Sequence, residues 1–478
     1  MRFQLSSEEW KTNPGIIEQR RKLFAFQTWV IAIYSAFISL PITFPWIAFF
    51  LGLIVAVVQW QHLLWTQKIK RHLPPLTVPI LALVAVYFVS GFVSGYSPAH
   101  DFKAGWKEAN ASLGILRSFW VYFWAYYVFF YQPEAEAKVV PSALLFGAAA
   151  GLTAAVEQLG NIHFGYQYLQ GTGFLSGPMA FSGVMQLLSL LGLGVWATGT
   201  YKWCPGPFKQ QRVFIAIAVA NILGLFFAAE RSGWLGFIAG AFVVTVLVSR
   251  KLVARVAAIG AIAAIIGWFC VPMVQARLLP LLDWQHEPSS QQRLAIWDHA
   301  WKQYTHSTSR EIVGVGPKKF DPYKPAGELP GKQELEHAHS NYLQSLTTTG
   351  AVGLLVYLWL SIASIVLAWK NFFRARNTPE QSQIHLGISL GILGGLVSLM
   401  VAGLFEYNFG TGNVRMAQWF LLGLLSSGNS FDSIPFLDRQ TDDDSKSAPK
   451  SKKGSTRKQA PPTPKALKKQ ARRRRKSK

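Results

Sequence analysis

Charged side chains are scarce in this sequence of 478 residues. Asp, Glu, Lys and Arg together make up 15% of it, whereas an ordinary soluble domain has about 25%. Acidic residues are the scarcer kind, with 24 Asp and Glu against 47 Lys and Arg. Since 50% of the residues are hydrophobic and 18 are Trp, the composition is far from that of a soluble domain and indicates a membrane protein.

Cysteine is also rare, and several familiar motifs are missing. Cys204 lies in a short loop and Cys270 inside an apolar run, which implies no disulfide framework. The sequence contains no Walker motif, no dinucleotide-binding fingerprint after a strand and no nucleophile elbow. Cytosolic chemistry driven by nucleotides is therefore not supported, and no cofactor is predicted.

The positive charge is concentrated at the C-terminal end. Residues 445–478 hold 15 Lys and Arg and no acid, which accounts for most of the net charge of +23. We predict that residues 431–478 form a disordered basic tail in the cytoplasm, attracted to anionic lipid. No folded reading module accompanies the tail, so nucleic acid is not expected as a partner. Residues 1–23 lack a cleavage site after a short apolar core and are predicted to stay as a cytoplasmic segment.

Between these ends, residues 24–430 contain repeated apolar runs of the length that crosses a membrane. A helix needs about 20 residues to span about 30 Å of hydrocarbon, and in lipid the backbone must satisfy its own hydrogen bonds. The sequence therefore predicts an all-α polytopic membrane protein with about twelve transmembrane helices. The predicted spans are 24–41, 45–65, 76–96, 111–131, 138–158, 174–199, 211–229, 233–249, 253–273, 342–369, 384–405 and 413–428.

The loop charges predict the orientation of these spans, because Lys and Arg concentrate on the cytoplasmic side of short loops. Most even-numbered junctions are rich in them, as at 202–212, although the fourth junction is a weak case. The odd-numbered junctions 160–173 and 406–412 contain none. Both termini are therefore placed in the cytoplasm. The large loop of about 274–341, between spans 9 and 10, is placed outside.

This outer loop is predicted to be partly helical. Ser289 followed by Gln292 resembles a capping box. Behind it, apolar residues recur at the spacing of an amphipathic helix that lies at the membrane surface; they are Ile296, Trp297, Ala300, Trp301 and Tyr304. The chain then turns at Gly314–Pro317, where glycines permit positive φ. A packed subdomain over the membrane is the expected result.

Three residues on the outer side are candidates for chemistry. Arginine keeps its charge and grips phosphate oxygens with paired N–H groups, which suits Arg231 and Arg293. Histidine takes up a proton near neutral pH, which suits His339 at the start of span 10. Each also has a structural interpretation: Glu230 pairs with Arg231, Arg293 is a solvated helix residue, and His339 is an interfacial structural histidine.

Two other classes of function compete. His337 and His339 lie near Glu334 and Glu336, yet their spacing matches no established zinc motif, so no metal site is predicted. Twelve spans also suit a secondary transporter of a small anion. The sequence shows no convincing internal repeat, and its candidate charges gather at one face, which favours chemistry at the interface.

Three motifs together resemble one known family. His339-Ser340, nine residues, Gly350, two residues and Gly353 form the first. The second is Glu230-Arg231-Ser232-Gly233-Trp234-Leu235, and the third is Arg293-Leu294-Ala295-Ile296-Trp297 followed by Val313-Gly314-Val315-Gly316-Pro317. In this order, over about 225–430, the chain resembles the O-antigen ligase and O-antigen polymerase superfamily of bacterial membrane proteins.

The resemblance implies a metal-independent, inverting glycosyltransferase of the bacterial inner membrane. Such enzymes take a glycan from undecaprenyl pyrophosphate at the periplasmic face and join it to an acceptor sugar. His339 would deprotonate the acceptor hydroxyl, and Arg231 and Arg293 would bind the pyrophosphate. Glu230 departs from the Ser or Thr that many relatives carry. Arg117, Lys103 and Lys107 are further candidates for contacts with lipid phosphates.

The predicted function is that of an O-antigen ligase, which transfers polysaccharide to the lipid A-core acceptor in lipopolysaccharide biosynthesis. A polymerase of the same superfamily, whose acceptor is another lipid-linked glycan, is the alternative. A protein O-glycosyltransferase of this superfamily is a more distant one. The sequence separates these acceptors poorly, and the compact loop subdomain with a single histidine motif favours the ligase.

Overall fold

A computed structural model describes residues 14–65, 73–97, 100–160, 170–324, 335–377 and 384–428. Helices build the fold throughout these ranges, where no strand occurs and one isolated β-bridge joins Tyr323 to Leu335. The predicted all-α class is therefore confirmed. The predicted basic tail and most of the N-terminal segment lie outside the described residues.

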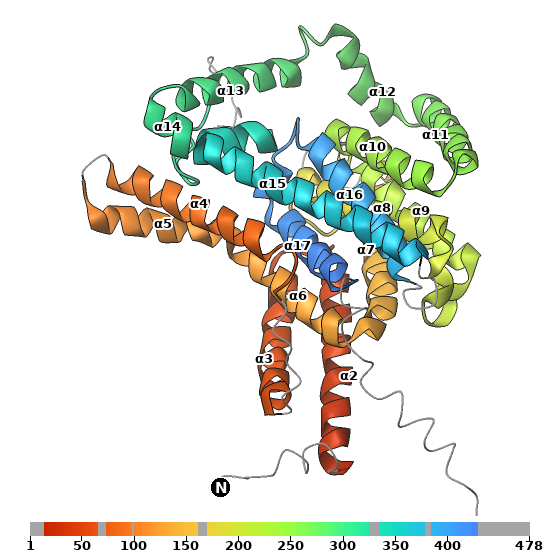
Figure 1. Cartoon of the computed structure of the whole chain (residues 1–478). Helices are drawn as coiled ribbons and strands as arrows, with labels where there is room; N and C mark the ends of the chain where they lie inside the picture. The colour runs from red at the N-terminus through yellow and green to blue at the C-terminus, as the bar shows by residue number, and fades with distance from the viewer. Residues whose placement is uncertain are drawn as a thin grey trace, which may run out of the picture. The chain divides into compact units, whose positions relative to one another are not determined.

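Each of the twelve predicted spans lies on a helix, or on a pair of helices that follow one another (Figure 1). They are α2 (Pro14–Phe37), α3 (Thr43–Trp65), α4 (Thr77–Tyr96), α5 (Phe102–Leu116) with η1 (Arg117–Phe119) and α6 (Trp120–Tyr131), α7 (Glu136–Leu159), α8 (Pro178–Ala197), α9 (Gln211–Phe227), α10 (Arg231–Val248), α11 (Arg250–Cys270), α15 (Asn341–Asn377), α16 (His385–Ala402) and α17 (Gly412–Ser427).

Eight helical stretches of the described residues are long and apolar enough to cross a membrane. The apolar parts of α2, α3 and α9 are shorter than that. The fold is thus that of an integral membrane protein. The count of twelve spans and the outward side of the large loop remain predictions.

Glycines allow the helices around α8 to approach one another closely. A Cβ atom added at Gly391 of α16 would lie 2.6 Å from the Cα of Leu191 in α8. A Cβ added at Gly240 of α10 would lie 2.5 Å from the carbonyl oxygen of Gly394 in α16. In lipid, such backbone contacts replace the hydrophobic driving force between helices, because lipid tails are as apolar as leucine. The helices α8, α10 and α16 therefore form a tightly packed frame.

The tenth predicted span is not one straight helix. Gly350 interrupts α15 with φ 71° and ψ −174°, so a short helix before it is followed by a long one after it. The freed carbonyl oxygens of Thr347 and Thr348 accept hydrogen bonds from the backbone N–H groups of Val315 (2.9 Å) and Gly316 (3.0 Å). The large loop is therefore hydrogen-bonded directly into the break.

The large loop is partly helical, as predicted. It contains α12 (Pro272–Leu278), η5 (Leu279–Asp283), α13 (Pro288–Tyr304) and α14 (Thr308–Val313). Of the predicted amphipathic face of α13, Ile296 and Ala300 are fully buried in a small core with Phe320 and Ala338. In Figure 1, α13 and α14 lie along one end of α15. The part of the apolar face formed by Ile296 and Ala300 therefore packs on protein, whereas Trp301 is 52% exposed.

The predicted capping box at Ser289 is wrong. Helix α13 begins earlier, at Pro288, and Glu287 is its N-cap, with its carboxylate accepting a 2.6 Å hydrogen bond from the Ser290 N–H. Proline suits the first helical position, and a carboxylate is stabilised by the positive helix end. The predicted glycine turn is confirmed, since φ is 77° at Gly314 and 106° at Gly316.

Substitution of Gly391 by valine tests the packed frame. The added side chain would meet the backbone of α8, so we expect Gly391→Val to lower the free energy of unfolding by about 1–3 kcal/mol. Gly260→Ala is the matched control, because a Cβ at Gly260 has no neighbour within 4 Å. Thermal unfolding of the purified protein in detergent measures both. Equal melting temperatures for the two variants would show that the close contact is not needed.

Candidate active site

His339 is held in an unusual backbone conformation two residues before the first residue of α15. Its φ is 46°, in the left-handed region that side chains other than glycine seldom adopt, and such strain concentrates at functional sites. The preceding residue is fixed on both sides: Ala338 donates its N–H to Gln344 Oε1 (2.7 Å) and accepts from Trp297 Nε1 (3.0 Å). Hydrogen bonds from α13 and α15 to Ala338 therefore fix the backbone that positions the side chain of His339.

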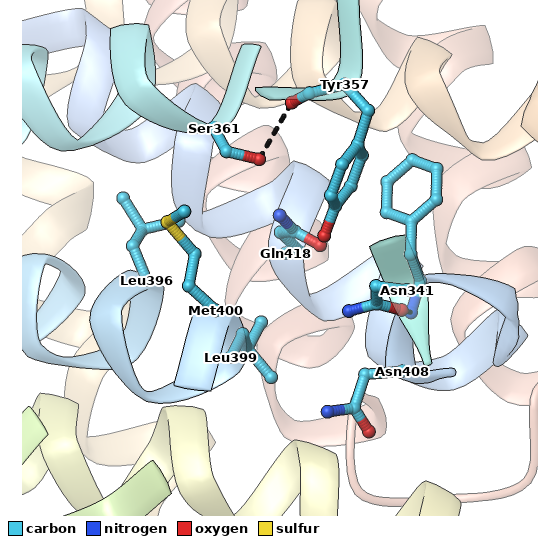
Figure 2. A pocket seen from close by; sticks show the side chains of 9 residues that line it. Asn341, Tyr357, Ser361, Leu396, Leu399, Met400, Asn408 and Gln418 are labelled. Carbon is cyan, nitrogen blue, oxygen red and sulfur yellow. Dashed lines mark hydrogen bonds between the residues drawn. The ribbon is translucent and has the colours of Figure 1, made fainter. Parts of the chain in front are cut away.

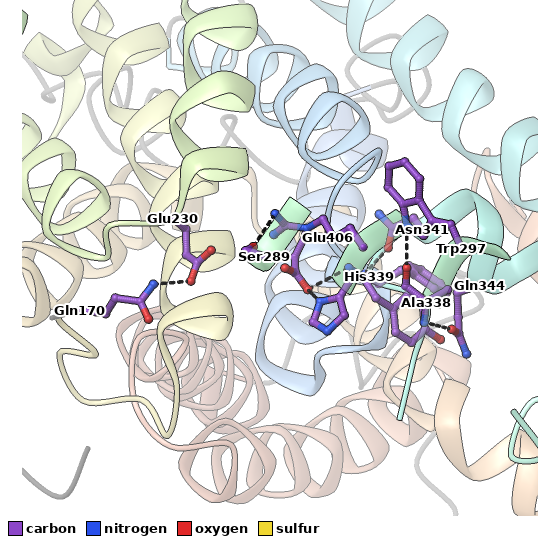
Figure 3. A network of polar contacts seen from close by, with 12 residues as sticks. Gln170, Glu230, Ser289, Trp297, Ala338, His339, Asn341, Gln344 and Glu406 are labelled. Atoms are coloured by element: carbon purple, nitrogen blue, oxygen red, sulfur yellow. Dashed lines mark hydrogen bonds and ion pairs between the residues drawn. The ribbon is translucent and has the colours of Figure 1, made fainter. Parts of the chain in front are cut away.

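Glu406 is the partner of His339. The imidazole Nδ1 lies 3.3 Å from Glu406 Oε1, and only 4% of Glu406 is exposed (Figure 3). Burial acts to raise the pKa of this carboxyl, but the hydrogen bond and charge of His339, with His337 and Arg293 nearby, outweigh it and lower the pKa below its ordinary value. An ionised Glu406 accepts a hydrogen bond from the Nδ1–H group of His339. In that tautomer Nε2 of His339 carries no proton and has a free lone pair.

Asn341 joins the two segments that carry this pair. Its N–H donates to the carbonyl oxygen of Gly403 (2.8 Å), and its Oδ1 accepts from the N–H of Phe409 (3.0 Å). Figure 2 shows Asn341 and Asn408 beside a cavity of about 10 Å³ between α15, α16 and α17. That volume is about one water molecule. Asn341 thus fixes the loop of Glu406 relative to His339.

His337 lies against His339, with 4.2 Å between the ring centroids. Burial, together with the neighbouring His339, lowers the pKa of His337 to about 4, so its ring is neutral at physiological pH. The ligand atoms of His337, His339 and Glu406 lie within 4.8 Å of one another, and this group could hold a metal ion. No metal site was predicted from the sequence, where the acids considered beside these histidines were Glu334 and Glu336 and not Glu406.

The structural alternative in which Glu230 pairs with Arg231 is not found, because each side chain has another partner. Arg231 begins α10, and its Nη2 donates to Oε1 of Glu287 at 3.0 Å. Glu230 instead accepts a 2.7 Å hydrogen bond from Nε2 of Gln170 (Figure 3). The two neighbours diverge because Glu230 is the extended residue before α10, whereas Arg231 is the first helical one. Arg231 thereby links α10 to the N-terminus of α13.

A group of arginines and acids surrounds Glu230. Burial and the charge of Glu406 raise the pKa of Glu230 to about 7, against the opposing effects of Arg277, the Gln170 hydrogen bond and Arg293. Arg293 donates from Nη1 to Ser289 Oγ (3.2 Å), while its Nε is buried with no hydrogen-bond partner in the described part of the chain. Arg293 therefore lies close enough to Glu406 for their charges to interact, and Arg231 belongs to the same group of arginines through its charge interaction with Arg277.

The other three predicted cations lie elsewhere in the fold. Lys103 and Lys107 are on α5, which packs against α4. Arg117 is in η1, where its guanidinium carbon lies 5.2 Å from the ring centroid of Trp46 in α3. Contact of these side chains with lipid phosphates remains a prediction.

Sequence reasoning missed Glu406, Asn341 and Arg277. Glu406 had a recognisable signal, because it is an acid directly after an apolar run in a junction without cations. Arg277 had a weaker one, as a basic residue in the first turns of the large loop. Chemically, the site combines a histidine with a free nitrogen, suited to accept a proton, and arginines suited to bind an anion.

Removal of the Glu287 carboxylate tests the link between α10 and α13. The side chains of Arg231 and Glu287 are 17% and 9% exposed, so Glu287→Ala loses a largely buried ion pair and the N-cap of α13. We expect a loss of about 2–4 kcal/mol in the free energy of unfolding. Asp298→Ala on the same helix removes the exposed pair with Lys302 and should cost less than about 1 kcal/mol.

Thermal unfolding in detergent compares these two variants with the unaltered protein. If Glu287→Ala melted no lower than Asp298→Ala, the Arg231–Glu287 contact would not stabilise the site.

One comparison with known proteins matches the segment that holds most of this site. Residues 215–358 match the family model described as O-Antigen ligase, from α9 to the part of α15 just beyond Gly350. No curated protein matches the chain. The matched segment contains Arg231, Arg293 and His339, the residues on which the sequence resemblance rested. This match supports the resemblance of the segment to the O-antigen ligase and polymerase superfamily of membrane proteins.

Proposed function

We propose that the protein is an O-antigen ligase. It transfers a polysaccharide from undecaprenyl pyrophosphate to the lipid A-core acceptor at the periplasmic face of the bacterial inner membrane. The observation that carries this proposal is the arrangement of the His339–Glu406 pair beside the arginine group. The donor class follows from the match to the O-antigen ligase family, and a pyrophosphate is an anion that Arg231 and Arg293 can bind with paired N–H groups.

His339 is the general base in this proposal. Its Nε2 takes the proton of the acceptor hydroxyl while that oxygen attacks the anomeric carbon of the donor sugar. Glu406, 3.3 Å from Nδ1, holds the tautomer and stabilises the imidazolium that forms. A single direct displacement inverts the configuration at the anomeric carbon.

The arginines stabilise the leaving group. As the bond between the anomeric carbon and the phosphate oxygen breaks, the electron pair and a negative charge pass to undecaprenyl pyrophosphate. Arg231 and Arg293 bind that charge, and Arg277 adds a third cation to the field. Helix α10 begins at Arg231 and α13 at Pro288, so two helix N-termini add positive potential.

The reaction is proposed to need no metal ion. The His339–Glu406 pair supplies a base without a metal ion. The arginines neutralise the pyrophosphate, as a bound metal ion often does. His337, His339 and Glu406 nevertheless have a spacing that suits a metal. Transfer assays after treatment with EDTA distinguish a metal-free His339 base from a metal site. Unchanged transfer supports the metal-free base, whereas lost transfer that a divalent ion restores refutes it.

Gel analysis of surface polysaccharide in a deletion strain tests the ligase assignment. Loss of all attached glycan, with lipid-linked polymer accumulating, identifies a ligase. A core that bears a single repeat identifies a polymerase, which is the alternative function within the superfamily.

Loss of the proposed base should abolish the reaction. We expect His339→Ala to lower glycan transfer by about 10²–10⁴-fold and Arg231→Ala to abolish it, while both proteins stay folded in the membrane. Glu406→Gln should give a smaller loss, since the amide keeps the shape and loses the charge. His306→Ala, an exposed histidine in the same loop, is the control. Normal transfer by His339→Ala or Arg231→Ala would refute the roles assigned to them.

Donor affinity should fall as the pH rises through about 7. Below its pKa of about 7 Glu230 is neutral, and above it Glu230 adds a negative charge beside the arginines. That charge repels the pyrophosphate, so the KM for donor should rise several-fold between about pH 6 and about pH 8. Glu230→Gln should flatten this dependence and keep the low-pH affinity. A pH dependence identical in the two proteins would show that Glu230 does not face the donor.

A further inference from the structure

An apolar groove with a volume of about 720 Å³ runs between α3 and α6. Aromatic side chains line most of it, among them Trp46, Phe50, Trp120 and Tyr127. Phe50 is 55% exposed, Leu53 41% and Trp120 57%. The groove is therefore open along its side, toward the surroundings of α3 and α6.

The floor of the groove depends on a glycine. Trp124 is only 4% exposed, and a Cβ atom at Gly52 would lie 2.7 Å from its Cε2. Because Gly52 has no side chain, the Trp124 indole can pack close against α3. A side chain there would push the ring into the groove, so the local sequence keeps the groove open.

The groove is longer than one leaflet of a bilayer. Its lining runs from Trp46 to Gln59 on α3 and from Arg117 to Gln132 along η1 and α6. At about 1.5 Å per helical residue, this corresponds to about 20 Å. Half of the hydrocarbon core is about 15 Å thick. A hydrocarbon chain that filled the groove would thus be longer than one that stays within its own leaflet.

One end of the groove carries a cation. Arg117 is the only charged residue among the described side chains that line it, and its guanidinium lies over the Trp46 ring at 5.2 Å. The opposite end is lined by the uncharged Gln59 and Gln132. The groove is therefore complementary to a long apolar chain with an anionic group at one end.

The cationic end adjoins the segment that carries Glu406. The turn between α2 and α3 accepts a hydrogen bond at Leu40 O from Asn413 Nδ2 (2.9 Å). Arg415, which lies close enough to Arg117 for their charges to repel, donates from Nη1 to Phe409 O (2.9 Å). Residues 406–415 thus connect the mouth of the groove to the partner of His339.

We propose that this groove binds the polyprenyl chain of the lipid-linked donor, with Arg117 attracting its anionic head. The inference rests on the proposed function, since it concerns the lipid part of the same substrate. A phospholipid acyl chain fits less well, because it ends within its own leaflet. Phospholipid head groups also occur throughout the bilayer, so a single cation would not select one. The groove gives the donor a fixed path from the membrane toward the arginines of the active site.

Photo-crosslinking to undecaprenyl phosphate tests the proposal without requiring transfer. The full chain in nanodiscs carries p-benzoyl-phenylalanine in place of Leu53, which lines the groove, or in place of Ile54, which is 64% exposed and does not line it. Radiolabelled undecaprenyl phosphate is the probe. Unlabelled undecaprenyl phosphate, farnesyl phosphate and phosphatidylglycerol are the competitors.

We expect labelling at position 53 well above that at 54, displaced by undecaprenyl phosphate and not by the other two. Arg117→Gln should weaken it about five-fold, as one lost cation predicts, and Arg117→Lys should restore most of it. Ala56→Trp, which fills the groove, should abolish labelling, whereas Ile54→Trp should not. Equal labelling at both positions, or displacement by phosphatidylglycerol, would overturn the proposal.

The outcomes separate this inference from the proposed function. Transfer that persists without groove labelling refutes the groove alone. Specific labelling of a protein that transfers no glycan supports the groove and refutes the proposed ligase.

Discussion

Backbone contact between α8, α10 and α16 is the constraint on which the remaining structure depends. In lipid, association of helices gains little from burying apolar side chains, so packing requires that the backbones approach closely. Gly391 and Gly240 permit that approach, because a Cβ atom at either position would collide with the neighbouring backbone. The loops at the ends of this frame can then carry polar residues that the membrane itself would not tolerate.

The polar residues of the site are organised as two linked halves. His339, Glu406 and Asn341 form one half, tied by hydrogen bonds between the start of α15 and the loop after α16. Arg231 and Glu287 belong to the other, in which the start of α10 is joined to the start of α13. Charge interactions of Glu230 with Glu406 and Arg293 connect the halves. A proton acceptor and an anion site are thereby held at adjacent helix ends.

The sequence predicted the parts of this structure that follow from periodicity and composition. The helices, the glycine turn at Gly314–Gly316 and the apolar face of α13 are local properties, and all were found. Partners were less predictable. One alternative paired Glu230 with its neighbour, yet Arg231 donates to Glu287, which is 56 residues further along the chain. Likewise Glu406 lies 67 residues from His339. No spacing rule predicts contacts that arise only when distant helix ends meet.

The break at Gly350 couples the position of His339 to the conformation of the large loop. The segment 341–349 is a short helix fixed at both ends: Asn341 is hydrogen-bonded to Gly403, and the carbonyl groups of Thr347 and Thr348 to the backbone at 315–316. Nothing in this segment can shift without displacing either the membrane helices or the loop. The conformation of the loop is therefore transmitted over two and a half helical turns to His339. A loop substitution that touches no residue of the active site can still move the proposed base away from the hydroxyl it must deprotonate.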